Sequence, residues 1–170
     1  MQAVVKKLFI SGALVALSFG NAFAEEVIKP FVLGYTTSGD MAAVTTEVKG
    51  KVESAGFEIA GTYSPYDGAV VIAITNDDLK KAAASSEFGG YAAGQRVTLT
   101  QVGEEIQVSY TNPLYYSEAY RLEDTSGAQA ALGSLETALG KKETYGTGKK
   151  QLTQADLRKY HYMFGMEYFD

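Results

Sequence analysis

The sequence contains no cysteine, and only one of its 170 residues is a histidine. Without cysteine the chain can form neither disulfides nor zinc–thiolate sites, so a disulfide-stapled scaffold is excluded. A Ser-His-Asp triad would have to use His161, and no Gly-x-Ser-x-Gly motif precedes it, so nucleophilic hydrolysis is not predicted. No low-complexity tract is present either. The remaining composition, with 46% hydrophobic and 21% charged residues, is typical of a globular protein with a packed core.

Residues 1–24 have the features of a cleaved secretory signal peptide. Two lysines precede an apolar stretch over 8–19, and an A-x-A peptidase site ends at Ala24. The stretch is shorter than the roughly 20 residues of a membrane-spanning helix, so no transmembrane anchor is predicted in the mature chain. We therefore expect a periplasmic or secreted protein.

Cleavage after Ala24 would remove 24 of the 170 residues and leave 146. Because two lysines are lost with the leader, the formal net charge would change from −5 to −7. A nucleic-acid-binding protein needs a cationic surface that releases phosphate counterions. The acidic balance therefore predicts no nucleic-acid partner.

The mature sequence alternates between strand and helix patterns. Period-2 or β-branched runs predict strands, of which the run over 69–75 is apolar on both faces and is expected to be central and covered on both sides. Apolar stripes at spacings of three and four predict helices, the first capped by Ser38 or Asp40, and Gly103-Glu104 predicts a two-residue hairpin turn. Strands are expected over 31–36, 57–63, 69–75, 96–102 and 105–111, with long helices over 41–55 and 127–139 and a short one over 76–86.

This order, β-α-β-β-(α)-β-β-α, predicts an α+β fold with a mostly antiparallel sheet packed against two long helices. Residues 25–140 would form the single α+β domain, followed by a Gly/Lys-rich linker over 141–152. Thr153 and Asp156 resemble a capping box, so 153–170 is expected to hold a short helix and a terminal strand. That strand either completes the sheet or begins a second unit of a longer protein.

Three features between residues 31 and 139 carry a resemblance to a known family. A helix ends at Gly56-Phe57, an apolar strand leads into a capped helix over 69–86, and a hairpin ends at Asn112-Pro113. The run GFEIAGTYSPYDGAVVIAITNDDLKKAAASS, followed by GQRVTLTQVGEEIQVSYTNPLYY, resembles the bacterial family catalogued as domain of unknown function 302. The resemblance implies a β-α-β(4)-α fold similar to that of the TATA-binding protein, and it carries over no catalytic residue.

A group of tyrosines beside an arginine is the strongest candidate for a binding site. Tyrosine combines apolar area with one polar group, and the loop after a hairpin is a plausible rim for a pocket or an interface. The alternative is that these rings only cover the sheet. The predicted site consists of Tyr110, Tyr115, Tyr116, Tyr120 and Arg121, to which Tyr63, Tyr66 and Tyr91 could be added.

The leading hypothesis is a non-catalytic module, without a cofactor, that binds a small apolar molecule or a protein partner through these tyrosine-bearing loops. One alternative is a periplasmic enzyme built from tyrosine, arginine and carboxylates, in which Arg121 or Arg96 holds an anion. A third hypothesis is copper handling by His161, Met163 and Met166, because imidazole and thioether groups suit copper(I). In a strand, however, Met166 would project to the opposite face from the other two.

Overall fold

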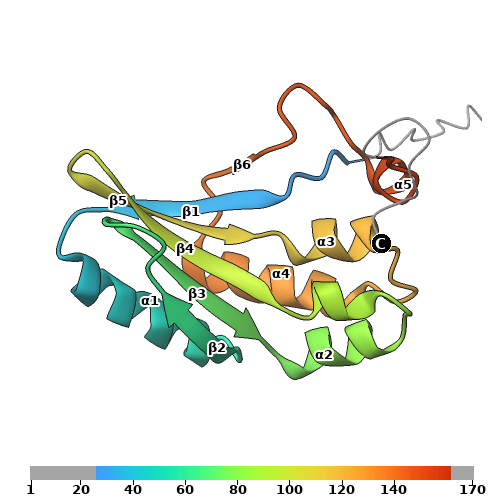
Figure 1. Ribbon diagram of the computed structural model, residues 1–170, viewed down its shortest axis with the longest axis horizontal. Helices are drawn as coiled ribbons and strands as arrows, with labels where there is room; N and C mark the ends of the chain where they lie inside the picture. The colour runs from blue at the N-terminus through green and yellow to red at the C-terminus, as the bar shows by residue number, and fades with distance from the viewer. Residues whose placement is uncertain (1–25, 162–170) are drawn as a thin grey trace, which may run out of the picture.

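The computed structural model describes residues 26–161, which form one six-stranded antiparallel sheet with helices on one of its faces (Figure 1). The strand order across the sheet is β2-β3-β4-β5-β1-β6. The strands are β1 (Phe31–Thr37), β2 (Glu58–Tyr63), β3 (Ala69–Thr75), β4 (Gln95–Val102), β5 (Glu105–Thr111) and β6 (Glu143–Tyr145). The helices are α1 (Met41–Ser54), α2 (Asp77–Ala84), α3 (Pro113–Ala119), α4 (Ser126–Leu139) and α5 (Gln154–Leu157), with a 3-10 turn η1 (Gly89–Ala92). The predicted α+β class is confirmed.

Short-range signals in the sequence place several of these elements correctly. The Asp40 carboxylate accepts a hydrogen bond of 2.9 Å from the Ala43 N–H at the start of α1, and Asn76 caps α2 in the same way. Gly103 has φ +61° in the two-residue turn between β4 and β5, as a turn with glycine at its first central position requires. Each of these signals acts within a few residues, which is why it can be read from the chain.

The core lies between the sheet and the two long helices. Val48 and Val52 of α1 and Leu135 of α4 are completely buried. They pack in one cluster with the inward-facing side chains of the strands, which include Val32, Ile72, Ile74, Val97, Leu99, Ile106 and Val108. Among the described residues, every helix is too short or too polar to cross a bilayer.

Strands β2 and β3 differ from expectation. A register shift between Ile59 and Gly61 marks a bulge in β2. The sequence pattern of this strand puts Phe57, Ile59, Gly61 and Tyr63 on one half-buried face. Because one extra residue reverses which side chains face the core, that alternation fails after Ile59, and Tyr63 is 56% exposed. In β3, Val71 and Ala73 are only half-buried, since no helix of the described chain covers that face. The expectation of a strand covered on both sides was wrong.

The segment predicted as a linker over 141–152 contributes strand β6 at the sheet edge, where it pairs with the first half of β1 (Figure 1). The Lys142 N–H also donates to the Leu33 carbonyl at 2.8 Å. The Thr153–Asp156 capping box and the helix after it are confirmed. The terminal strand predicted beyond that helix lies outside the described residues, apart from its first residue, His161.

Candidate functional site

Tyr110 lies in the core, away from the surface where the sequence placed it. It is 1% exposed, on the same face of β5 as Ile106 and Val108, and its hydroxyl donates to the Gly140 carbonyl at 2.8 Å. Burial raises the pKa of the Tyr110 phenol, and the nearby Glu136 carboxylate raises it further. The role of Tyr110 is therefore to join β5 to the end of α4.

Tyr115 and Tyr116 lie on α3, a helix where a loop was expected. The Asn112 side chain accepts hydrogen bonds from the Leu114 and Tyr115 N–H groups at 3.0 and 3.5 Å, and a proline occupies the first helical position. The two rings meet edge to face with centroids 5.6 Å apart. Tyr115 packs against the main core, whereas Tyr116 packs against a smaller cluster formed by Ala82, Ala92 and Leu122. Burial raises the pKa of the Tyr115 phenol.

Tyr120 stacks on Tyr91 of the neighbouring 3-10 turn. The ring centroids are 5.3 Å apart and the planes are inclined by 24°. Tyr120 rests on the same small cluster as Tyr116, and Tyr91 remains 63% exposed. We call Tyr91, Tyr116 and Tyr120 the tyrosine patch. The sequence predicts Tyr91 only as a residue that could be added to the site, because nothing in the local sequence links it to α3.

Arg121 holds the turn that orients Tyr120. Its φ is +55°, in the left-handed region, and its N–H donates to the Glu118 carbonyl while the Leu122 N–H donates to the Ser117 carbonyl. These are the two bonds of a Schellman motif, with arginine where glycine is usual. Leu122 is 1% exposed beyond the turn, so the end of α3 is fixed by packing as well as by hydrogen bonds.

The carboxylate nearest in sequence to the patch, Glu118, points inward. Its side chain is 5% exposed and forms an ion pair with Arg158, which follows α5. Arg158 also donates to the Leu122 carbonyl at 2.7 Å, so it ties α5 to both ends of the turn. Because Glu118 is paired and covered, it is not placed to act as an acid or base toward a molecule at the patch. Sequence reasoning did not single out this pair, whose members are 40 positions apart.

The copper hypothesis stays a prediction, because only one of its three residues is described. His161 is exposed, while Met163 and Met166 lie outside the described residues. Within residues 26–161, no group of three or more His, Cys, Asp or Glu side chains is arranged to hold a metal ion.

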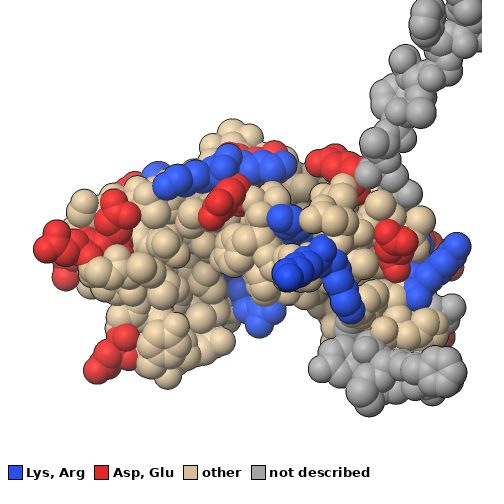
Figure 2. Space-filling model, turned by 90° about the horizontal axis from the view of Figure 1, so that it is seen from above, with Lys and Arg blue, Asp and Glu red and all other residues tan. Residues whose placement is uncertain are grey.

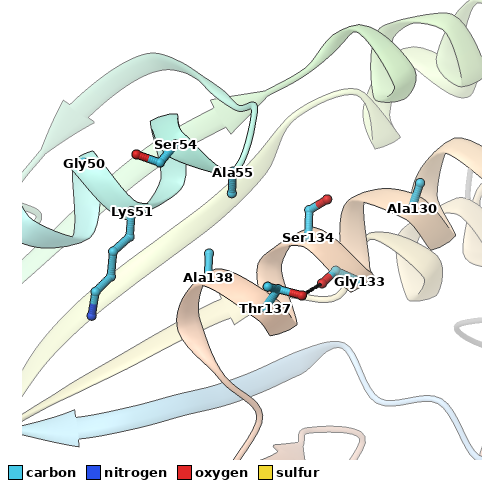
Figure 3. A pocket seen from close by; sticks show the side chains of 9 residues that line it. All are labelled: Gly50, Lys51, Ser54, Ala55, Ala130, Gly133, Ser134, Thr137 and Ala138. Atoms are coloured by element: carbon cyan, nitrogen blue, oxygen red, sulfur yellow. Dashed lines mark hydrogen bonds between the residues drawn. The ribbon is translucent and has the colours of Figure 1, made fainter.

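A second surface is the groove between α1 and α4 (Figure 3). It is wide open to solvent, with a volume of about 840 Å³, and eight of its nine lining residues are glycine, alanine, serine or threonine. The exception is Lys51, which lies over the Tyr35 ring with its ammonium 4.7 Å from the centroid and forms a 2.7 Å ion pair with Glu47. The hydrogen bond to Glu47 raises the pKa of Lys51.

Taken together, the fold is an α+β layer structure with helices on one sheet face, and its sites are aromatic or lined by small residues. The computed structure is similar to the crystal structure of an uncharacterized conserved protein, DUF302, from Bacillus stearothermophilus, with a TM-score of 0.52 and 14% sequence identity. The match covers 62% of this chain and 94% of that protein. At this identity the likeness concerns the fold, and it agrees with the family resemblance found in the sequence. No family model and no curated protein matches the chain.

Proposed function

We propose that the protein is an exported, non-catalytic binding module that docks a protein partner through the tyrosine patch. The observation that supports this most is the Tyr91–Tyr120 stack, in which a largely exposed ring is held against a half-buried one. Tyrosine is enriched among the residues that dominate binding energy at protein interfaces, because it offers large contact area with few rotatable bonds.

The side chains and the turn beneath the tyrosine patch hold its rings in place before a partner binds. Tyr116 and Tyr120 stand on buried alanine and leucine side chains, and the Schellman turn at Arg121 fixes the backbone beside them. A surface that is ordered before binding loses less conformational entropy on docking than a flexible loop does. The patch residues do not line the groove between α1 and α4, and Tyr91 is 63% exposed. The patch is therefore better suited to contact with a protein surface than to enclosing a small molecule.

Export is the second part of the proposal. It is supported by the leader-like segment 1–24, and a chain without cysteine can fold in an oxidising compartment with no redox requirement. In Figure 2, acidic side chains occupy the end where the β4–β5 hairpin turns and also lie beside the separate groups of basic side chains elsewhere on this face. Charges of both signs are therefore interspersed on this face.

The test compares three forms of the exported protein as bait for partners from the same compartment. Tyr91→Ala/Tyr120→Ala removes the stack, and Tyr63→Ala/Tyr66→Ala removes two tyrosines that are 56% and 63% exposed elsewhere. A partner should be retained by the wild type and by the control pair, and lost from the patch variant. A photo-crosslinking residue at position 91 should attach to the same partner, and one at position 63 should not. Identical retention by all three baits would contradict the proposal.

The groove supports a second candidate, the binding of a small apolar molecule. Its volume lies within the range of ligand sites, and its walls of small side chains leave room for an apolar chain or ring. A Cβ added at Gly133 meets no atom within 4 Å, so Gly133→Leu should narrow the groove without a clash at its Cβ. The probe is the fluorescence of 1-anilinonaphthalene-8-sulfonate. Enhancement lost in Gly133→Leu and kept in Tyr91→Ala/Tyr120→Ala would support this candidate, and equal enhancement in all forms would exclude it.

A further inference from the structure

The sheet face opposite the helices carries a hollow that neither proposal uses. Register identifies the side chains on this face, since they alternate with core residues such as Val97 and Tyr110. In one row across the sheet, Ala73 pairs with Arg96, and Thr111 pairs with Phe31. The Arg96 N–H, which donates to the Thr111 hydroxyl at 2.9 Å, joins the two halves of that row.

The hollow encloses about 140 Å³. It is lined by Phe31, Arg96, Thr98, Ser109, Thr111 and Tyr145, and also by Tyr110, whose ring lies on the core side of the sheet. Its volume is close to that of an engineered cavity of about 150 Å³ that accepts a benzene ring. A single six-membered ring with a small substituent therefore matches its size.

An aromatic wall closes one side of the hollow. Phe31 and Tyr145 are paired across β1 and β6, and their ring centroids are 5.5 Å apart with planes inclined by 31°. Gly146, with φ +106°, lets the chain turn tightly after Tyr145, because a Cβ there would lie 2.5 Å from Pro30. The position of this wall thus depends on backbone packing and not on the two rings alone.

Arg96 places a positive charge on the side of the hollow opposite the aromatic wall. Arg96 is exposed, and its guanidinium forms no ion pair within residues 26–161. Its neighbours across the strands, Ala73 and Thr111, and Thr98 along its own strand are uncharged. An arginine without a carboxylate partner, in a chain of net negative charge, is available for an external anion.

The floor between the wall and the cation consists of short hydroxyl side chains. The Thr111 hydroxyl is occupied, since it donates to Gln95 at 2.7 Å and accepts from the Arg96 N–H. The Thr98 hydroxyl makes one long contact, 3.5 Å, to the Ser109 carbonyl. The Ser109 side chain has no hydrogen bond to the described residues, so its hydroxyl can serve a bound molecule.

We propose that this hollow binds a small planar aromatic carboxylate, with its ring against Phe31 and Tyr145 and its carboxylate paired with Arg96. Adjacent strands are about 4.8 Å apart, and Arg96 and Phe31 are separated by one intervening strand, so roughly 10 Å lies between their backbones. Two inward-leaning side chains leave space for one ring and one carboxylate across that width. A single cation favours a monoanion, and the aromatic wall favours a ring over a bare anion such as phosphate.

The test is a titration of the 15N-labelled protein with benzoate, followed by NMR. Benzoate should shift the backbone amides of Arg96, Ser109 and Tyr145 and saturate with a Kd on the order of 1 mM, as expected for a ligand this small in a shallow site. Benzamide keeps the ring without the charge, cyclohexanecarboxylate keeps the charge without aromaticity, and inorganic phosphate is an anion alone. Each should bind several-fold more weakly than benzoate.

Variants separate the two halves of the site. Arg96→Gln should weaken benzoate binding about tenfold or more, the size of effect expected for a lost charge-assisted hydrogen bond. Lys81→Gln removes the same charge from α2 and should leave the affinity unchanged. Tyr145→Leu keeps apolar cover and should weaken benzoate more than phosphate.

Three results would overturn the proposal: no saturable shift at these amides, equal affinity for benzoate and phosphate, or unchanged benzoate affinity in Arg96→Gln. Tyr91→Ala/Tyr120→Ala should bind benzoate as the wild type does, so failure of the tyrosine patch and failure of this site can be told apart.

Discussion

Two glycines of the same helix should respond in opposite directions when each is replaced by alanine. Both Gly127 and Gly133 lie in α4. A Cβ at Gly133 would meet no atom within 4 Å, whereas a Cβ at Gly127 would lie 2.6 Å from the Asp78 carbonyl oxygen and 3.3 Å from the Ala82 Cβ. Gly127 is therefore the point at which α4 crosses α2 with their backbones in near contact.

The magnitudes follow from this geometry. Alanine in an open helical position is more stable than glycine by about 0.5–1 kcal/mol, because glycine loses more backbone entropy on folding. At Gly127 the two helices must separate by roughly 0.7 Å to restore an ordinary carbon–oxygen contact of about 3.3 Å. Overpacking of this kind costs about 1–3 kcal/mol, which exceeds the gain in helix propensity.

Urea unfolding monitored by circular dichroism at 222 nm measures both effects. With a slope of about 2 kcal/mol per molar urea, Gly133→Ala should raise the midpoint by about 0.3–0.5 M, and Gly127→Ala should lower it by up to about 1 M. Each variant is the control for the other, since the substitution and the helix are the same. If Gly127→Ala were as stabilising as Gly133→Ala, the close crossing of α2 and α4 would be refuted.

Three other predictions concern the core, an ion pair and the leader. Tyr110→Phe should cost about 1 kcal/mol at neutral pH, because the Gly140 carbonyl loses its donor. Since burial raises the pKa of Tyr110, its contribution to wild-type stability is complete below about pH 10 and declines above it, so the difference between wild type and variant in urea melts should shrink at alkaline pH. Arg158→Ala should destabilise by about 1–3 kcal/mol in the same assay, because it leaves Glu118 buried and unpaired; a loss below about 0.5 kcal/mol would contradict this. Mass spectrometry of exported protein should find Glu25 as the first residue, and an intact 170-residue chain would exclude cleavage.

Local signals account for the parts of the fold that the sequence could predict. Asp40 and Asn76 are caps because their side chains reach an N–H three residues ahead, which needs no knowledge of the rest of the chain. The helix α3 could have been found in the same way, since Asn112 followed by Pro113 is a helix start. Likewise, Ile106, Val108 and Tyr110 alternate along β5 and share one face, and this pattern would have predicted Tyr110 in the core in place of the binding site.

Long-range pairing accounts for the parts that could not be predicted. Strand β6 has only three residues, and it is a strand because β1 offers it an edge. The stacking of Tyr91 on Tyr120 depends on how η1 and α3 meet, and the Arg158–Glu118 pair on how α5 docks. The aromatic wall beside Arg96 likewise requires Phe31 and Tyr145, which only the finished sheet brings together.

The pairing of β1 with β5 and β6 also has a consequence for the order in which the molecule can fold. Among the described strands, β1 is the first to leave the ribosome, and both of its neighbours lie in the second half of the chain; the Ile28 N–H also donates to the Leu152 carbonyl at 2.9 Å. Such contacts between distant segments give a high contact order, which slows folding because a long loop must close first. The sheet cannot be completed cotranslationally until almost the whole chain has been synthesised. A chain with this delay stays unfolded for longer, which is the state in which a polypeptide can be threaded through a narrow translocation channel.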